Sequence, residues 1–145
     1  MPRIERNADI VWEGSVARGA GRIAPATGAF AELPFTLASR VAEPEGRTSP
    51  EELLAAAHGA CFTMSLATEL VQAGTPPGRL EVNCRIVMDE VPGQGHQIVG
   101  SIVRVRADVE GADEAALDEA IAKADAGCPF SALLKRAGAD VQISR

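Results

Sequence analysis

The stretch TSPEELLAAAHGACF, residues 48–62, indicates the fold more strongly than any other part of the chain. Ser49 suits the N-cap of a helix, Pro50 suits its first position, and Glu52, three residues after the cap, completes a capping box. The residues that follow, 53–67, are apolar or small nearly all round. A helix of that composition is typically buried on every side. The sequence therefore predicts a long buried helix that starts at residue 50.

Strands are expected on both sides of this helix. It should end at Gly74, before Pro76 and Pro77, because glycine commonly follows the last helical turn and proline cannot continue it. Residues 8–40 are predicted to be β structure, interrupted by glycines, and residues 41–48 a polar loop. The expected N-terminal strand segments are residues 10–12, 16–23 and 33–37.

The C-terminal half reads as a hairpin, two helices and a last strand. Alternating residues predict strands at about 80–89 and 97–110, with the turn Pro92-Gly93-Gln94-Gly95 between them. Asp113 should cap a helix that Gly127 stops, and Pro129 should open a short helix to residue 136. Residues 141–143 form the last expected strand. Strands and helices come in blocks, so the predicted class is α+β with mostly antiparallel pairing, in a single domain over residues 1–145.

Composition excludes several classes of function. The chain has 145 residues, 46% of them hydrophobic, and a net charge of −6. Acidic character with 3% aromatic residues argues against nucleic acid or an anionic membrane as the main partner. No apolar run approaches the roughly 20 residues of a membrane span, and the start resembles no signal peptide, so a cytoplasmic location is expected. In a reducing compartment, cysteines are more often catalytic or metal-binding than structural.

The three cysteines differ in their surroundings. Cys128 should lie at a helix N-cap, where backbone N–H groups and the helix dipole favour a thiolate; a small buried hydrophobe is the alternative. Cys61 lies in an apolar helix that by itself raises the thiol pKa, so a partner cation must be supplied for reactivity. Cys84 is interpreted as a packing or surface residue.

Two other kinds of site were weighed against thiol chemistry. A zinc site could draw on the cysteines with His58 and His96, and His58 shares a helix face with Cys61. However, the sequence has no C-x-x-C and no paired-histidine spacing. Gly19-Ala20-Gly21 lacks the third glycine of a dinucleotide fingerprint and opens no helix.

Several motifs resemble one known family. Residues 48–62 are similar to the central-helix signature of the osmotically inducible protein C and organic hydroperoxide resistance family, and residues 126–129, AGCP, resemble its second cysteine motif. Residues 12–14, WEG, and 18–21, RGAG, resemble the osmotically inducible branch. The similarity runs from about residue 8 to 143. The two cysteine motifs at this separation are the specific part of it.

The resemblance implies a fold, an activity and a set of site residues. The OsmC-like fold is an intertwined homodimer of α+β subunits, with long central helices packed between antiparallel sheets. The implied activity is reduction of hydroperoxides by cysteine, without metal or flavin, with a small or protein-bound dithiol as reductant. Cys61 matches the peroxidatic thiolate, Cys128 the resolving thiol and Glu51 the site carboxylate. The active-site arginine matches Arg40 first, with Arg18 retained as the position of the other branch.

Elementary chemistry agrees with these assignments. An arginine can hold a thiolate in an apolar site, and Glu51 can fix that guanidinium bidentately. An apolar wall that includes Phe62, Met64 and Phe130 suits an alkyl or lipid chain, and plain core packing is the alternative for Phe62 and Met64, favoured for at least one of them. Ten residues of helix separate Glu51 from Cys61 by roughly 15 Å, so the carboxylate is expected to serve a partner chain's cysteine. The alternative function is a lipid-like ligand-binding protein of the same fold, without peroxidase turnover.

Overall fold

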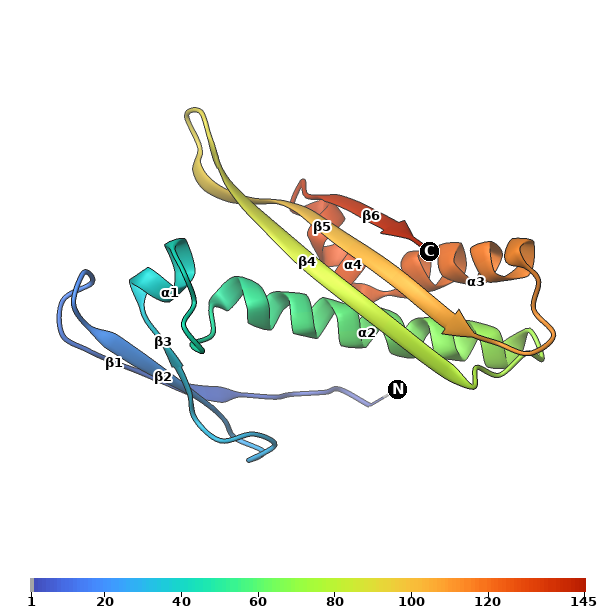
Figure 1. The fold of residues 1–145 in the computed structure, drawn as a ribbon, viewed down its shortest axis with the longest axis horizontal. Helices are drawn as coiled ribbons and strands as arrows, with labels where there is room; N and C mark the ends of the chain where they lie inside the picture. Colours follow the sequence, from blue (N-terminus) through green and yellow to red (C-terminus); the bar gives the residue numbers. More distant parts are fainter. Residues whose placement is uncertain (1) are drawn as a thin grey trace. The chain divides into compact units, whose positions relative to one another are not determined.

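The computed structural model describes residues 2–145. They form two compact units, divided between Leu53 and Leu54. The first unit contains an antiparallel sheet in the order β1-β2-β3, followed by one short helix (Figure 1). The second unit contains a sheet in the order β4-β5-β6 and the remaining helical segments. The mixture of separate sheets and helices confirms the predicted α+β class.

The first unit is built from β1 (Ala8–Glu13), β2 (Ala20–Pro25), β3 (Leu33–Phe35) and α1 (Leu37–Val41). β1 pairs with β2 in a register that sets Trp12 opposite Gly21. The ring of Phe35 on β3 occupies the place that a Cβ at position 21 would need, so Gly21 permits this close packing.

Two predictions for the first unit were wrong in detail. The predicted strand over residues 16–23 begins only at Ala20, because residues 16–18 form the turn that joins β1 to β2. Residues 37–41 form α1 rather than β structure or loop. Thr36 and Ser39 cap α1 reciprocally: the Ser39 N–H donates to the Thr36 hydroxyl and the Thr36 N–H donates to the Ser39 hydroxyl.

The long helix α2 (Pro50–Gln72) starts and ends where its local signals predicted. The Glu52 N–H donates to the Ser49 hydroxyl oxygen at 3.1 Å, which satisfies one of the free donors of the first turn. After the last turn, Gly74 adopts a φ of 79°. The Thr75 N–H then reaches back to the Leu70 carbonyl at 3.0 Å, as in a glycine-terminated helix.

Burial of α2 is one-sided in the single chain. Its fully or nearly buried residues recur at helical spacing along one face: His58, Gly59, Phe62, Leu66 and Leu70. On other faces, Met64 is 66% exposed and Val71 is 59% exposed. The prediction of a helix buried on every side is therefore wrong for the chain alone. By length and composition α2 could cross a membrane, but Phe62, Leu66 and Leu70 pack in a core, as in a folded domain.

The sheet of the second unit consists of β4 (Arg79–Val91), β5 (Gly95–Asp108) and β6 (Asp140–Ser144). β4 and β5 form a long antiparallel hairpin with a bulge between Val87 and Met88. Its turn lies at the predicted position, and its free end projects beyond β6 in Figure 1. β6 pairs with β5 in parallel, the one exception among the described strand pairs to the expected antiparallel pairing.

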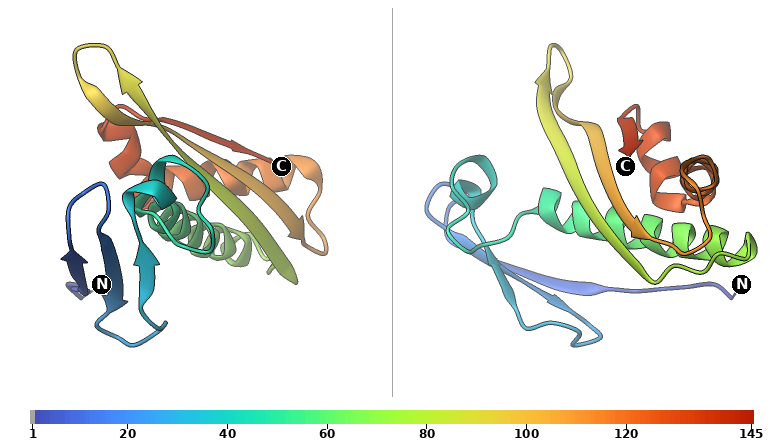
Figure 2. Two further views of the ribbon diagram at one scale, coloured as in Figure 1. Left: turned by 60° about the vertical axis from the view of Figure 1, so that its left-hand side comes forward. Right: turned by 45° about the vertical axis from the view of Figure 1, so that its right-hand side comes forward.

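The helices of the second unit share one face of this sheet (Figure 2). α3 (Glu114–Gly127) begins after Asp113, whose carboxylate accepts from the Ala116 N–H at 2.8 Å, as predicted. α4 (Pro129–Arg136) follows immediately. The core between helices and sheet contains Phe62, Leu66, Leu70, Val103, Val105, Ala120, Ile121 and Ala124.

Candidate active site

Cys128 occupies the junction between α3 and α4. It is both the C-cap of α3 and the N-cap of α4, with Pro129 at the first helical position. This is the helix-cap position that the Gly127 and Pro129 signals predicted. The side chain is fully buried, so Cys128 is shielded from solvent as well as placed at a helix start.

Cys61 lies against this junction from α2. Burial raises the pKa of the Cys61 thiol, and hydrogen bonding and charge interaction with Cys128 raise it further. A hydrogen bond from the Phe130 backbone partly offsets these effects by lowering the same pKa. Phe130 is the second residue of α4, so the first turn of that helix directs an N–H at the Cys61 sulfur. Within the described residues, the groups that shift the pKa of Cys61 include no cation.

The two thiols therefore form a pair with unequal access. Cys61 is half-buried, whereas Cys128 is fully buried. All three cysteines are free thiols, with no disulfide between them. A small reagent can reach Cys61 first, and an oxidised Cys61 would have the Cys128 thiol beside it. Such a pair can cycle between dithiol and disulfide states.

The first unit contains the predicted carboxylate and arginine in direct contact. The Arg40 guanidinium donates from Nε at 2.9 Å and from Nη2 at 2.6 Å, both to Oε1 of Glu51. Two donors of the guanidinium thus bond to Glu51, for which a bidentate contact was expected. Burial pushes the pKa of Glu51 upward, but hydrogen bonds and charge attraction from Arg40, with help from Ser49, hold it below its usual range. Glu51 is therefore a carboxylate at neutral pH.

Arg40 also borders an apolar pocket of about 280 Å³. The pocket lies within the first unit, and its lining residues are Trp12, Val16, Phe35, Thr36, Leu37, Arg40 and Pro50. The Trp12 and Phe35 rings pack at a centroid distance of 5.5 Å and form part of its wall. One cation at the rim of an apolar hollow suits a ligand with a hydrocarbon body and a polar end.

Arg18, the alternative arginine, lies in the exposed turn between β1 and β2. Its backbone N–H closes that turn on the Ser15 carbonyl at 3.2 Å. Arg18 does not line the apolar pocket, which includes Arg40. The structure thus brings Arg40 and Glu51 together, and separately Cys61 and Cys128.

The expected apolar wall divides into different environments. Phe62 is fully buried in the core and serves packing. Met64 is largely exposed, whereas Phe130 is partly buried and packs against the core cluster. The plain packing alternative therefore holds for Phe62.

A buried polar cluster next to the cysteine pair was missed by the sequence reasoning. His58 is fully buried; its Nδ1 lies 2.8 Å from the Ser101 hydroxyl and its Nε2 lies 2.9 Å from the Ser131 hydroxyl. The Cys84 sulfur lies 3.5 Å from the Ser101 hydroxyl and 3.8 Å from His58 Nδ1. Burial lowers the pKa of His58 and raises the pKa of Cys84, so both groups are neutral at pH 7.

Close approach of α2 to β4 brings this cluster together. A Cβ at Gly59 would lie 3.1 Å from the Cys84 Cβ, so glycine allows the helix to reach the strand. The members of the cluster come from four elements: α2, β4, β5 and α4. The only sequence signal for the cluster is a histidine next to a glycine, His58-Gly59, within the apolar helix. Both ring nitrogens of His58 have serine partners. Within residues 2–145, no three His, Cys, Asp or Glu side chains are grouped to hold a metal ion.

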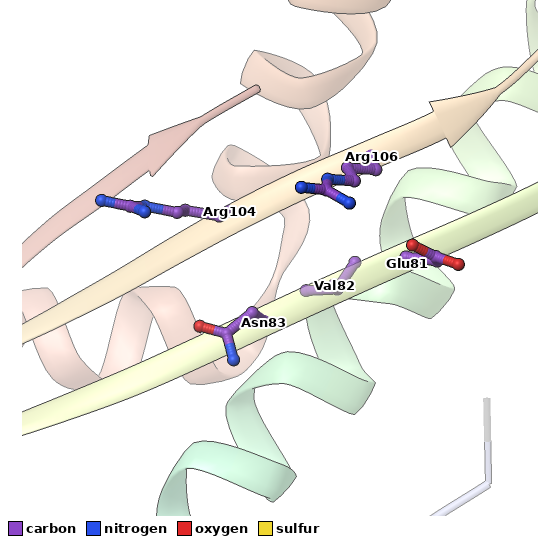
Figure 3. Close-up of a pocket in the computed structure, with 5 residues that line it drawn as sticks. All are labelled: Glu81, Val82, Asn83, Arg104 and Arg106. Atoms are coloured by element: carbon purple, nitrogen blue, oxygen red, sulfur yellow. The ribbon is translucent and has the colours of Figure 1, made fainter.

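A second hollow, of about 350 Å³, lies on the β4–β5 hairpin (Figure 3). Glu81, Val82 and Asn83 line it from β4, and Arg104 and Arg106 line it from β5. Figure 3 shows the two arginines projecting from their strand without converging on one point. No cysteine lines this hollow, and it contributes nothing to the thiol pair.

Comparisons with known proteins agree on one family. Residues 43–144 match the family described as OsmC-like protein. The chain is 36% identical over 132 residues to peroxiredoxin OsmC of Escherichia coli, covering 91% of each protein. It is 32% identical over 85 residues to an organic hydroperoxide resistance protein of Xanthomonas axonopodis, covering 58% of the chain and 57% of that protein. The fold matches the crystal structure of an organic hydroperoxide resistance protein OsmC from Legionella pneumophila, with a TM-score of 0.73, 20% identity and 98% coverage of both chains.

Proposed function

The chain belongs to the OsmC-like protein family, and from that premise we propose that it is a cysteine-based peroxidase acting on organic hydroperoxides. The observation that carries the proposal is the contact between a reachable thiol, Cys61, and a buried one, Cys128. The names of two relatives, a peroxiredoxin and an organic hydroperoxide resistance protein, support the same reaction class.

The proposed reaction divides its two steps between the cysteines. The Cys61 thiolate attacks the terminal oxygen of the hydroperoxide, the O–O bond breaks, and the released alkoxide takes a proton to leave as an alcohol. Cys61 is thereby oxidised to a sulfenic acid. The Cys128 sulfur then attacks the Cys61 sulfur, a disulfide forms, and the hydroxyl departs as water. A dithiol reductant restores both thiols by exchange and is itself oxidised to a disulfide.

The unequal access of the two thiols supports this order of roles. Cys61 is half-buried, so a hydroperoxide can approach it from solvent. Cys128 is fully buried and can react only with a group already next to it. The first-turn N–H of Phe130 also favours negative charge on Cys61, as expected for the attacking sulfur.

An arginine from a second copy of the chain completes the proposed site. None of the described groups that shift the pKa of Cys61 is a cation, and a nearby cation is a common means of stabilising a reactive thiolate. Arg40 is our first choice because Glu51 holds it in place and it borders the apolar pocket. Arg18 is the second choice. Because Glu51 and Cys61 are ten residues apart in sequence on one helix, roughly 15 Å by helical rise, we propose that Glu51 and Arg40 serve the partner's Cys61 in a homodimer.

The exposed apolar residues of α2 support the homodimer. Met64 and Val71 would remain in water in a single chain, although the sequence pattern is that of a helix buried on all sides. A second copy packed along α2 would cover them. The apolar pocket beside Arg40 also supports an organic substrate, because its walls suit an alkyl group while the guanidinium suits the peroxide oxygens.

The deciding experiment measures consumption of cumene hydroperoxide and hydrogen peroxide with a dithiol reductant in excess. We expect turnover with both, faster with cumene hydroperoxide, and none with Cys61→Ser. Cys84→Ser is the matched control, since it removes a thiol outside the pair, and it should retain turnover. Turnover by Cys61→Ser would refute the assignment. Absence of turnover in the wild-type chain, with stable binding of fatty-acid-like ligands, would instead support a lipid-like binding protein.

A further inference from the structure

The buried imidazole of His58 links the two segments that carry the paired cysteines. His58 lies three residues before Cys61 on α2, so the two side chains are one helical turn apart. Its Nε2 contacts the hydroxyl of Ser131, which lies in the first turn of α4. Cys128 is the N-cap of that same turn. One side-chain hydrogen bond thus ties the helix of one thiol to the helix start of the other.

The contact has the features of a rigid tie. His58 and Ser131 are both fully buried, so water does not compete for their hydrogen-bonding groups. The other ring nitrogen contacts Ser101 on β5, which fixes the plane of the ring. Since the imidazole is neutral, one of its nitrogens donates and the other accepts, and serine hydroxyls can play either part. Loss of the Ser131 hydroxyl would take from Nε2 the serine that it contacts at 2.9 Å, whereas Nδ1 also lies 3.8 Å from the Cys84 sulfur.

The first turn of α4 affects Cys61 in two ways. It holds Cys128, the proposed resolving thiol, and it presents the Phe130 N–H that hydrogen bonds to the Cys61 sulfur. Disulfide closure requires the Cα atoms of the cysteines to be about 4.4–6.8 Å apart, so small displacements of this turn change how often the thiols meet. A tie to α2 one turn away from Cys61 limits those displacements.

We propose that His58 is a positioning residue that clamps the first turn of α4 against α2 and so sets the Cys61–Cys128 thiol–disulfide equilibrium. The bond to Ser131 is the clamp, and the bond to Ser101 orients the ring without contacting α4. The inference rests on the proposed use of these two cysteines as a redox pair, and it assigns a specific part to the histidine behind them.

Two matched substitutions test the clamp. Ser131→Ala and Ser101→Ala each remove one hydroxyl from a fully buried serine that contacts the same imidazole. Purified full-length protein is equilibrated with mixtures of reduced and oxidised dithiothreitol. Free thiols are then alkylated, and the Cys61–Cys128 bridge is quantified by peptide mass spectrometry. Urea unfolding of each variant reports its general loss of stability.

We expect Ser131→Ala to lower the equilibrium constant for disulfide formation roughly tenfold, a reduction potential higher by about 30 mV. Ser101→Ala should change that constant less than about twofold. Both variants should lose stability because each removes a buried hydrogen bond, and Ser101→Ala should lose no more than Ser131→Ala because the Cys84 sulfur lies 3.8 Å from Nδ1. His58→Phe fills the ring volume without either hydrogen bond and should reproduce the Ser131→Ala shift. The inference is overturned if Ser131→Ala and Ser101→Ala shift the constant equally, or if His58→Phe leaves it at the wild-type value.

This equilibrium is measured without any peroxide, so its outcome is separate from that of the peroxidase assay. A shift confined to Ser131→Ala and His58→Phe in a protein without peroxide turnover would retain the clamp and refute the proposed function. Normal peroxide turnover by the wild-type chain, with an unshifted equilibrium in Ser131→Ala and His58→Phe, would support the proposed function and refute the clamp.

Discussion

Truncation of Leu66 tests the one-sided packing of α2. Leu66 is fully buried in the core cluster that includes Val103 and Ala124. Removing a leucine side chain from such a site costs about 2–5 kcal/mol, from lost burial and from the cavity that remains. We therefore expect Leu66→Ala to lower the free energy of unfolding by about 3 kcal/mol, a large part of the 5–15 kcal/mol typical of a domain. For a chain of this size, the melting temperature should fall by roughly 10 °C.

The measurement is urea denaturation at a fixed protein concentration, with the slope of the transition compared between variants. Leu133→Ala is the matched control: it makes the same chemical change on α4 at a residue that is 54% exposed. Its cost should stay within about 0.5 kcal/mol, as for other surface substitutions. If Leu66→Ala costs no more than Leu133→Ala, the packing of α2 against the core is refuted.

Four further outcomes concern the site. Cys128→Ser should consume about one equivalent of hydroperoxide and then stall, with mass spectrometry showing added oxygen on Cys61, because no resolving thiol remains; continued cycling would exclude Cys128 from resolution. Peptide mapping of oxidised wild-type protein should find a Cys61–Cys128 bridge and free Cys84, and Cys84 in the bridge would contradict the thiol pairing. Because burial lowers the pKa of His58, the unfolded chain binds a proton there more readily than the folded chain once the pH falls through the ordinary histidine pKa of about 6.5. The free energy of unfolding should therefore fall as the pH drops through that value, and fall less steeply in His58→Gln. Mixed dimers of Glu51→Ala and Cys61→Ser should recover about half the activity of a wild-type dimer, because one site then pairs an intact cysteine with an intact partner glutamate; mixed dimers without activity would place both residues in one subunit's site.

Local signals were sufficient for most helix boundaries. Ser49 and Pro50 start α2, Asp113 starts α3, and the Gly127 to Pro129 junction separates α3 from α4, all as predicted. These signals work because a cap is satisfied by backbone groups within about four residues, so its partners are in the same stretch of sequence. α1 was missed because its capping residues lie in a segment whose composition favours strand.

The site could be predicted only where it follows from motifs or helix ends. The helix-cap position of Cys128 was predictable from its neighbours, and the family resemblance singled out Cys61, Glu51 and Arg40. The contact between Arg40 and Glu51 spans eleven positions, and two guanidinium donors reach the Glu51 carboxylate. The interpretation of Cys84 as a packing or surface residue did not include its place beside a buried histidine.

The sequence by itself determined the α+β class, the long apolar helix and the capped junction at Cys128, because periodicity and capping are short-range properties. Only the tertiary structure decided that α2 buries one face in the single chain, that Cys61 rests against Cys128, and that His58 meets Ser101 and Ser131. Those contacts join residues 43 to 73 positions apart. They depend on how a helix, a strand and a second helix pack around one core, which no local pattern specifies.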